Sequence, residues 1–323
     1  MATGFRIKRL KSVTVLATLA PVTLLGCYGT PKTPSELKTS AITCMRNQDY
    51  ACAKQRWQAY IQMRPTDANA IASLGIAENK LDEDQAAVVQ FQKAIDLGEG
   101  TYDLFSYYAD SLAALGKMDQ AVDWYYKSLA VVPSLVDVRG KLAQLLVQKR
   151  RYFEALVLLA SFDDHLKSLG YPAYFTGQRI AIETAMQQAN PANFAEKAAI
   201  RLPGTYGSFY APVTIGQSHV TAFVVDTGAT LTTVSDGFLQ DSKAKYKILQ
   251  RSVDVETANG EHLRARLVNI DAMKVGAFDL TNVAAVECQG CQLLLGQDTL
   301  SRFDLASSKV QGVEFLTLRP RKF

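Results

Sequence analysis

A spacing of 34 residues constrains this chain more than any other feature of its sequence. Small residues, Gly or Ala, recur at this spacing in five positions. Two further sets of positions share the period, one of alanines and one of large apolar residues. Small residues let paired helices touch, and large residues fill the space between successive pairs. The sequence therefore predicts a stack of helical hairpins. The small column is Ala41, Gly75, Ala109, Ala143 and Gly177, the alanine column is Ala53, Ala87, Ala121 and Ala155, and the large column is Trp57, Phe91, Tyr125 and Leu159.

Turn and helix-ending residues support this interpretation. Pro65 and Pro133 lie two periods apart at helix-ending positions, and residues 116–119 are typical of the turn within a hairpin. The whole pattern resembles tetratricopeptide repeats, about four of them from Ser35 to Leu169, with a closing helix over 171–189. The resemblance implies an all-α superhelix at residues 35–189 whose concave surface binds a protein partner, without identifying that partner.

Four tyrosines in the third repeat could line a peptide groove. Aromatic residues at helical spacing are more often packing residues, so we expect these in the core. Residues 190–202 read as a linker, with a further helical turn expected over 194–200. The linker is short and partly apolar, so the flanking domains should touch. The tyrosines are Tyr107, Tyr108, Tyr125 and Tyr126.

The first 26 residues have the pattern of an export signal. Four basic residues precede an apolar stretch of 14 residues, 12–25, which is too short to span a bilayer comfortably. The segment ends in Leu24-Leu25-Gly26-Cys27, which resembles a bacterial lipobox. The resemblance implies that Cys27 carries lipid, with residues 27–34 as a tether. An ordinary signal peptide cleaved nearby is the alternative.

Removal of residues 1–26 also changes the charge. The full chain has 35 Lys and Arg against 31 Asp and Glu, and four of the basic residues lie in this segment. The mature chain is then neutral, so nothing in its charge points to nucleic acid. The lipobox resemblance implies a periplasm-facing lipoprotein, and Tyr28 after the cysteine favours the outer membrane of a Gram-negative bacterium.

A second group of signals lies in the C-terminal third. The apolar run 222–225 leads straight into Asp226-Thr227-Gly228-Ala229. An Asp at the end of a strand can meet a substrate amide, while the Thr hydroxyl ties the loop down and the Gly permits close backbone approach. Downstream, residues 253–261 alternate and enter Asn259-Gly260, a strong hairpin signal. Residues 294–303 then place two apolar residues and a Gly before a short helical stretch.

This order of signals resembles the retropepsin-like aspartic proteases over residues 202–323. The resemblance implies an all-β acid protease domain at 203–323, with Asp226 as the catalytic carboxylate and Thr227 and Gly228 holding its loop. It also implies substrate contacts from Ala229 and from a flap formed by Thr257, Ala258, Asn259 and Gly260. An inactive barrel that keeps the motif is the alternative.

One such motif per chain has a consequence for the active unit. Such enzymes hold two carboxylates about 3 Å apart that share a proton. The sequence supplies a single Asp-Thr-Gly, so the resemblance implies a homodimer. Strands near 208–215 and 312–318 alternate enough to be half-buried, and we expect them to build part of the contact between copies.

With Cys27 lipidated, four cysteines remain and fit an oxidising compartment. Repeat register puts Cys44 on the first helix of the first repeat and Cys52 at the start of the second helix, so the pair could face each other. Cys288 and Cys291 could close a tight turn. A C-x-x-C can also be redox-active or half of a zinc site, but its surroundings favour a structural disulfide.

The predicted function is peptide-bond hydrolysis by a water activated between two Asp226 carboxylates, with the repeats recruiting a substrate or partner protein. No cofactor is expected. The three histidines are scattered, so we predict surface or packing roles for them and no metal site. The alternative function is a non-catalytic lipoprotein adaptor whose repeats bind a partner and whose barrel dimerises. The histidines are His165, His219 and His262.

Overall fold

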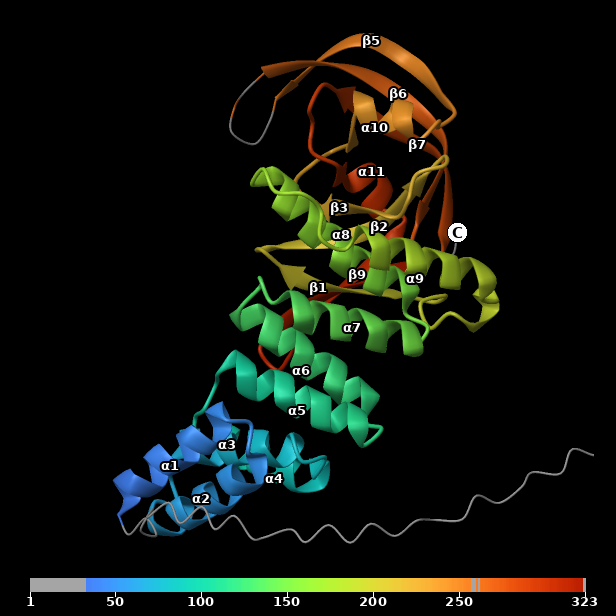
Figure 1. Ribbon diagram of the computed structural model, residues 1–323. Helices are drawn as coiled ribbons and strands as arrows, with labels where there is room; N and C mark the ends of the chain where they lie inside the picture. Colours follow the sequence, from blue (N-terminus) through green and yellow to red (C-terminus); the bar gives the residue numbers. More distant parts are fainter. Residues whose placement is uncertain (1–32, 257–259, 261, 322–323) are drawn as a thin grey trace, which may run out of the picture.

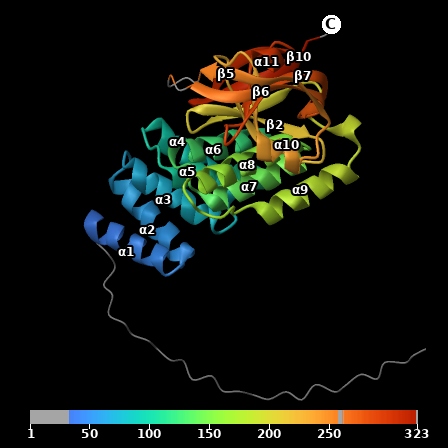
Figure 2. The ribbon, with the colours of Figure 1, turned by 90° about the horizontal axis from the view of Figure 1, so that it is seen from above.

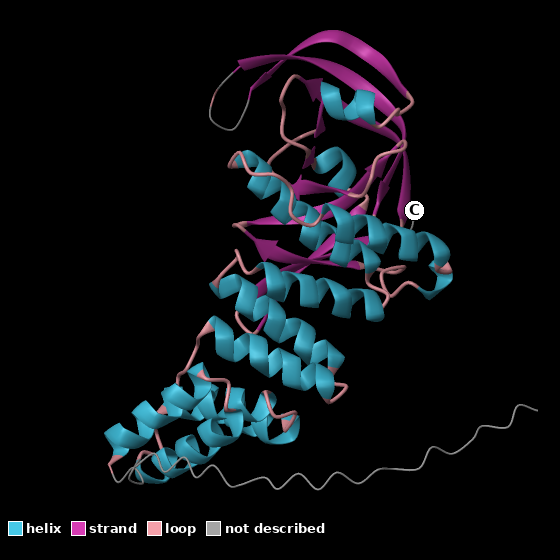
Figure 3. Ribbon diagram, in the orientation of Figure 1, coloured by secondary structure: helices cyan, strands magenta, loops and turns pink. Residues whose placement is uncertain are grey.

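The computed structural model describes residues 33–321 except 257–259 and 261. A helical region is followed by a β domain, and the two lie against each other (Figures 1 and 3). The helices of the first region are α1 (Pro34–Arg46), α2 (Tyr50–Met63), α3 (Ala68–Asn79), α4 (Asp84–Asp96), α5 (Tyr102–Ala114), α6 (Met118–Val131), α7 (Val136–Gln148), α8 (Tyr152–Ser168) and α9 (Thr176–Gln188).

Helices α1 to α8 pair in sequence as four hairpins, as the 34-residue period predicted. The columns of the repeat lie where helices meet. Ala41, Ala109 and Ala143 are completely buried, and so is Phe91 of the large column. At Gly75 an added Cβ would lie 2.8 Å from the Phe91 ring, so the small column is small because a neighbouring helix occupies the space. The tetratricopeptide-like architecture is confirmed.

Side-chain caps mark the starts of α1, α2 and α3. The side chain of Thr33 accepts a hydrogen bond from the Glu36 N–H at 3.2 Å, and the Glu36 carboxylate accepts one from the Thr33 N–H. Asp49 and Asp67 cap α2 and α3 in the same way. Each cap satisfies an N–H group that has no partner inside its helix.

The β domain is one continuous ten-stranded sheet over its described residues. Its order is β5-β6-β7-β4-β8-β3-β2-β1-β10-β9, with an added β6–β2 pairing that folds the sheet back on itself. The elements are β1 (Ile200–Thr205), β2 (Ser208–Ile215), β3 (Thr221–Val225), β4 (Thr232–Ser235), α10 (Asp236–Asp241), β5 (Tyr246–Glu256), β6 (His262–Val275), β7 (Phe278–Cys288), β8 (Leu294–Leu295), α11 (Gln297–Leu300), β9 (Phe303–Val310) and β10 (Val313–Pro320).

Three sequence-based expectations between the domains are wrong in detail. The closing helix begins at Thr176 and not at 171, because the Tyr174 and Phe175 N–H groups bond to Asp163 Oδ1 at 2.8 and 2.9 Å. No helix forms over 194–200; a short 3₁₀ turn lies earlier, at Pro191–Asn193. The linker predicted as 190–202 ends sooner, because Ile200 already pairs with Leu318 and is buried in the core of the β domain.

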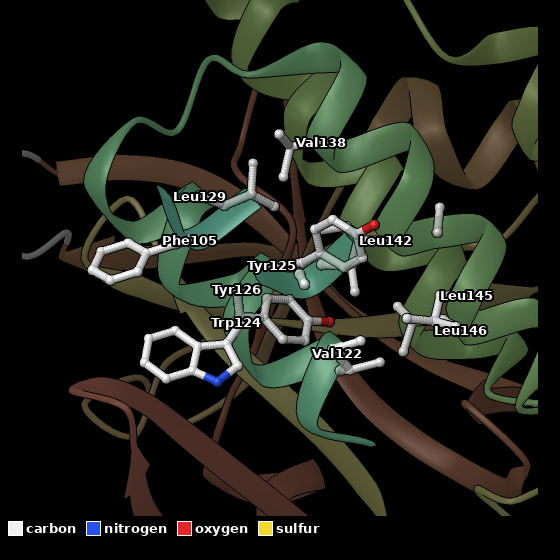
Figure 4. Packing of buried hydrophobic residues seen from close by; sticks show 14 of the residues in the cluster. Phe105, Val122, Trp124, Tyr125, Tyr126, Leu129, Val138, Leu142, Leu145 and Leu146 are labelled. Carbon is white, nitrogen blue, oxygen red and sulfur yellow. The ribbon is translucent and has the colours of Figure 1, made fainter. Parts of the chain in front are cut away.

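The two domains share a core, as the short apolar linker predicted. The apolar cluster that extends from α3 to α9 continues into the β domain through Val313 and Phe315 of β10. Figure 4 shows part of this cluster around α6, including Tyr126. The Tyr126 ring packs edge-on against that of Phe315, with ring centroids 5.4 Å apart. Helix α8 also packs on β1, β2 and β3, and Figure 2 shows α6 to α8 beneath the sheet.

The tyrosines of the third repeat lie mainly in this core. Tyr108, Tyr125 and Tyr126 are buried, which confirms the packing interpretation for these three. Tyr107 is half-buried, and the Lys80 ammonium lies over its ring, 4.8 Å from the centroid. The aromatic side chains of α5 and α6 therefore fill the space between hairpins.

The connecting segment also fixes the start of α8. Glu196, which is buried, accepts hydrogen bonds from the Phe153 and Glu154 N–H groups at 2.9 and 2.7 Å. Arg151 donates to the neighbouring Glu154 at 2.7 Å, and Tyr126 donates to the same carboxylate at 2.7 Å. Burial, together with the negative charge of Glu154, raises the pKa of Glu196 to about 8. The junction therefore contains a titratable group that caps a helix.

Candidate active site

Asp226 directly follows strand β3, and the main chain of residues 293–295 holds it in place. β3 and β8 are parallel, with Val224 and Val225 opposite Leu294 and Leu295. The Val224 N–H donates to the Leu293 carbonyl at 3.0 Å, and the Asp226 N–H donates to the Leu295 carbonyl at 3.1 Å. The two apolar residues before Asp226 thus pair directly with the two apolar residues before Gly296, and this pairing fixes the position of Asp226.

The Asp226 carboxylate is oriented by its own loop. Its Oδ1 accepts hydrogen bonds from the Gly228 N–H at 2.8 Å and the Ala229 N–H at 3.3 Å. Thr227 and Gly228 are exposed, while Asp226 and Ala229 are half-buried. Ala229 therefore contacts Asp226 through its main-chain N–H, which any residue other than proline at position 229 would also supply. Among the described residues no bond to Oδ2 occurs, so this oxygen is the one available to a water or substrate.

A second loop, 296–298, backs the first. The Gln297 N–H donates to the Ala229 carbonyl at 2.8 Å and its side-chain amide donates to the Thr227 carbonyl at 2.9 Å. The Asp298 N–H donates to the Thr230 carbonyl at 3.1 Å. N–H groups at the start of α11, which lack partners inside the helix, thus hold the carbonyls of the Asp226 loop.

Asp298 is a residue of the site whose role the sequence did not reveal. Its Oδ1 accepts hydrogen bonds from the Thr232 N–H at 2.7 Å and the Thr232 hydroxyl at 2.9 Å. The Thr232 hydroxyl also lies 2.7 Å from that of Thr299, and both threonines are completely buried. Burial raises the pKa of Asp298, and the bonds from both threonines oppose that shift. The only sequence signal was its place in the short stretch that follows two apolar residues and a glycine.

Gly296 is the second residue of this kind. A Cβ added there would lie 2.3 Å from the carbonyl carbon of Leu231 and 2.8 Å from the Thr232 nitrogen. These are main-chain atoms of the segment that leaves the Asp226 loop. The glycine is required for close approach of two backbones, since its own φ of −89° is open to any residue.

The structure describes only part of the hairpin that the sequence predicted as a flap. β5 and β6 form the predicted antiparallel hairpin, paired to its end at Glu256 and His262. Thr257, Ala258 and Asn259 lie outside the described residues. Gly260 has a φ of +80°, which suits a turn that needs glycine.

Apolar side chains of this hairpin pack toward the Asp226 loop. Val253 and Val255 of β5 join Ala265 of β6 in one small cluster. The cluster also contains Leu231, which follows the Asp226 loop directly, and the C-terminal end of β7. Its members are Leu231, Val253, Val255, Ala265, Val286, Cys288 and Cys291. We refer to it below as the wall cluster.

The remaining candidates divide as follows. Cys44 is bonded to Cys52, and Cys288 to Cys291. His165 stacks on Tyr206 with centroids 4.2 Å apart, His219 pairs with Glu183, and His262 is exposed. Among the described residues no group of His, Cys, Asp or Glu could hold a metal ion, and no helix is long and apolar enough to cross a membrane. Cys27 lies outside the described residues.

Comparisons with known proteins separate the two domains. Residues 211–302 match the family model described as "gag-polyprotein putative aspartyl protease". That range runs from β2 to the end of α11 and contains the Asp226 loop, the hairpin and the 296–298 loop. A comparison with curated proteins finds no match.

Solved structures resemble the helical region. A crystal structure of MamA is 22% identical with a TM-score of 0.40, over 43% of this chain and 82% of that one. MamA from Desulfovibrio magneticus RS-1, residue 41 to the end, is 14% identical with a TM-score of 0.40, over 42% and 77%. YrrB, a TPR protein with an unusual peptide-binding site, is 17% identical with a TM-score of 0.38, over 41% and 68%.

The repeat period and the four hairpins belong to residues 34–168, with α9 closing the stack at Gln188. The signature of the Asp226 loop falls inside the range of the family model. The chain thus combines a tetratricopeptide-like helical region at residues 34–188 with a β domain that matches the retropepsin-like aspartyl protease family over residues 211–302.

Proposed function

We propose that the protein is an aspartic endopeptidase whose active unit contains two copies of the chain. The observation that carries this proposal is the placement of Asp226 at the end of β3, with its main chain held by β8 and one carboxylate oxygen held by its own loop. An oriented carboxylate on a rigid loop is what a general base for water requires.

The reaction needs a second carboxylate. With Asp226 of two copies face to face, one carboxylate is ionised and takes a proton from water, while the other is protonated and donates toward the substrate carbonyl. Thr227 and Gly228 are exposed at the tip of the loop, which leaves this tip open to a partner copy. The substrate then lies extended beneath the β5–β6 hairpin and pairs its backbone as an added strand.

The expected strands of the dimer contact need revision. β10 is hydrogen-bonded to β9 along its whole length and to β1 over Phe315–Leu318. β2 pairs with β1, β3 and β6. Because the backbone of both strands is already paired within the chain, the contact between copies is better placed at the exposed Asp226 loop.

The helical region supplies the recruiting surface in this proposal. A hollow of about 370 Å³ lies between α5, α6 and α7, lined by polar side chains that include Asp110, Lys141 and Gln144. Lys141 pairs with Asp110 at 2.8 Å, so the hollow carries both signs of charge. We place a protein substrate or partner there, and the lipid on Cys27 holds the molecule on the periplasmic side of the outer membrane.

The test is proteolysis by the Asp226→Asn variant. Asn keeps the shape but cannot act as a base, so turnover of an unfolded protein substrate should fall by about 10³-fold or more. Asp279→Asn is the matched control, because Asp279 is an exposed carboxylate on β7 of the same domain. Wild-type turnover by purified Asp226→Asn would refute the assignment.

The dimer is tested separately by mixing. Asp226→Asn chains added to wild-type chains should reduce activity beyond simple dilution, because mixed dimers hold one functional carboxylate. Activity per wild-type chain should also fall on dilution. Activity that is proportional to wild-type chain concentration, in a sample that sediments as a monomer, would contradict the two-copy site. A stable dimer that binds partners and cleaves nothing would favour the adaptor.

A further inference from the structure

The Cys288–Cys291 disulfide lies beside the catalytic loop. It joins the last residue of β7 to the turn that leads into β8, with a sequence separation of 3. The next residues along the chain hold Asp226, since the Leu293 carbonyl accepts from Val224 and the Leu295 carbonyl accepts from Asp226. The bond therefore fixes a turn that starts the same short strand on which the position of Asp226 depends.

The same disulfide is part of the wall cluster. Cys288 is buried among Ala265 of β6 and Val286 of β7, and Cys291 packs against them while staying partly exposed. The disulfide thus shares one apolar cluster with side chains of the flap hairpin and with Leu231. Leu231, Val253 and Val255 also keep part of their surface exposed, which leaves apolar area available to a bound chain.

The neighbouring strand pairs hold the rest of this region independently. Ser235 of β4 lies opposite Cys288 in a parallel ladder, and Arg266 pairs with buried Glu287 at 2.6 Å. The turn itself, residues 289–293, has no regular structure, and the disulfide crosses it at its base. What the disulfide adds is therefore the conformation of the turn rather than the register of β7.

We propose that the Cys288–Cys291 disulfide is a positioning element of the substrate site. It fixes the 289–293 turn as a wall between the flap hairpin and the Asp226 loop, against which an apolar substrate side chain packs. This inference rests on the proposed protease function. Loss of the bond lets the turn move, which weakens substrate binding and loosens the support of Asp226.

The first test compares two double variants in the full chain in detergent. Cys288→Ala/Cys291→Ala should lower kcat/KM by about 10-fold or more, mainly through KM, since a displaced wall misplaces the substrate. It should also reduce the preference for Leu over Ala at the residue before the cleaved bond. Cys44→Ala/Cys52→Ala is the control, because α1 and α2 lie at the opposite end of the molecule (Figure 1), and its kcat/KM should be unchanged.

Reduction of the folded protein tests the same idea without a substitution at the site. In the Cys44→Ala/Cys52→Ala background, dithiothreitol is oxidised to its cyclic disulfide while the Cys288–Cys291 bond takes up two electrons and two protons to give two thiols. Activity should fall as this bond is reduced and return on reoxidation. Unchanged kcat/KM and unchanged Leu preference, in both the reduced protein and the double variant, would overturn the inference while leaving the protease function intact.

Hydrogen exchange separates the inference from the function on which it rests. Reduction should speed amide exchange in residues 289–296 and 226–232 and leave the helical region unchanged. If the wild-type protein cleaves nothing, the protease function fails, and this measurement still decides the positioning role. Equal exchange in both segments before and after reduction would refute it.

Discussion

Two glycines show how differently the two domains are built. At Gly75 in the helical region, an added Cβ would meet only the edge of the Phe91 ring, at 2.8 Å. At Gly296 in the β domain, it would meet the backbone of residues 231 and 232 at 2.3 to 2.8 Å. A ring can rotate or shift slightly, whereas this backbone is part of the loop that carries Asp226.

The two domains also differ in how far the effect of a local change spreads. Each hairpin of the helical region packs on its neighbours, so the effect of a change is confined to adjacent hairpins. The candidate site is built from residues 226–232, 253–256, 262–265 and 286–298, which meet only when the sheet is complete. Local errors should therefore weaken the helical region gradually and should disable the β domain outright.

The largest expected effect is that of Gly296→Ala. The added methyl group cannot fit without moving the 231–232 backbone, so we expect a cost of about 5 kcal/mol or more and no measurable proteolysis. Gly237→Ala, in α10 of the same domain, has nothing within 4 Å of its new Cβ and is the control. Circular dichroism and turnover should separate the two variants. A folded, active Gly296→Ala protein would contradict the backbone contact.

The second effect is that of Phe91→Ala. Phe91 is completely buried between repeats, and its removal leaves a cavity that should cost about 3 kcal/mol. Because Phe91 lies on α4, whereas α6 and α8 are helices that pack on the sheet, kcat of the folded molecules should be unchanged. Calorimetry and turnover on the same sample check this. A parallel loss of kcat would show that the two domains are coupled more tightly than the packing indicates.

The third effect concerns pH and the junction between the domains. The folded protein holds the Glu196 proton more tightly than the unfolded chain, because the pKa of Glu196 rises from 4.5 to about 8. The resulting stabilisation is complete below pH 4.5 and is lost as the pH rises through 8. The Tm of wild type minus the Tm of Glu196→Gln should therefore decrease by several degrees between pH 5 and roughly pH 8.5, because only the wild type loses this stabilisation.

Glu314→Gln serves as its control, since Glu314 is an exposed carboxylate on β10 and its replacement should leave the pH dependence unchanged. A Tm difference that increases with pH would contradict the raised pKa. That result would mean that the two N–H donors at the start of α8 stabilise the ionised carboxylate more than burial destabilises it.

The smallest effect is expected for Gly75→Ala. Alanine has the better helix propensity by about 1 kcal/mol, and the displaced Phe91 ring offsets part of that gain. Alanine already occupies the same column at Ala41, Ala109 and Ala143. The net change in unfolding free energy should be below about 1 kcal/mol, with unchanged activity. A loss as large as that of Phe91→Ala would mean that the ring cannot move.

The helical region was the more predictable part of the fold. Its period, its small and large columns and its proline positions are all local signals that recur, and they give the four hairpins directly. The start of α9 and the end of the linker were predicted at the wrong residues, because a tertiary contact sets each of these two boundaries. Asp163 binds the chain just before Thr176, and Ile200 is drawn into the sheet by Leu318.

The candidate site was predictable only at its centre. Asp226, Thr227, Gly228 and the hairpin follow from contiguous motifs. The roles of Gly296 and Asp298 do not, because each depends on atoms more than 60 positions away in the sequence, at residues 231 and 232. The contact between the Cys288–Cys291 turn and the flap hairpin is of the same kind.

By itself, the sequence determined the repeat architecture and the position of the Asp-Thr-Gly loop, because residues close in the chain interact whatever the rest of the fold does. Only the tertiary structure decided how the helical region and the sheet share a core, which strands of the sheet have neighbours on both sides, and what surrounds Asp226. Those properties arise from strand pairings between distant segments, and local propensity does not specify distant pairings.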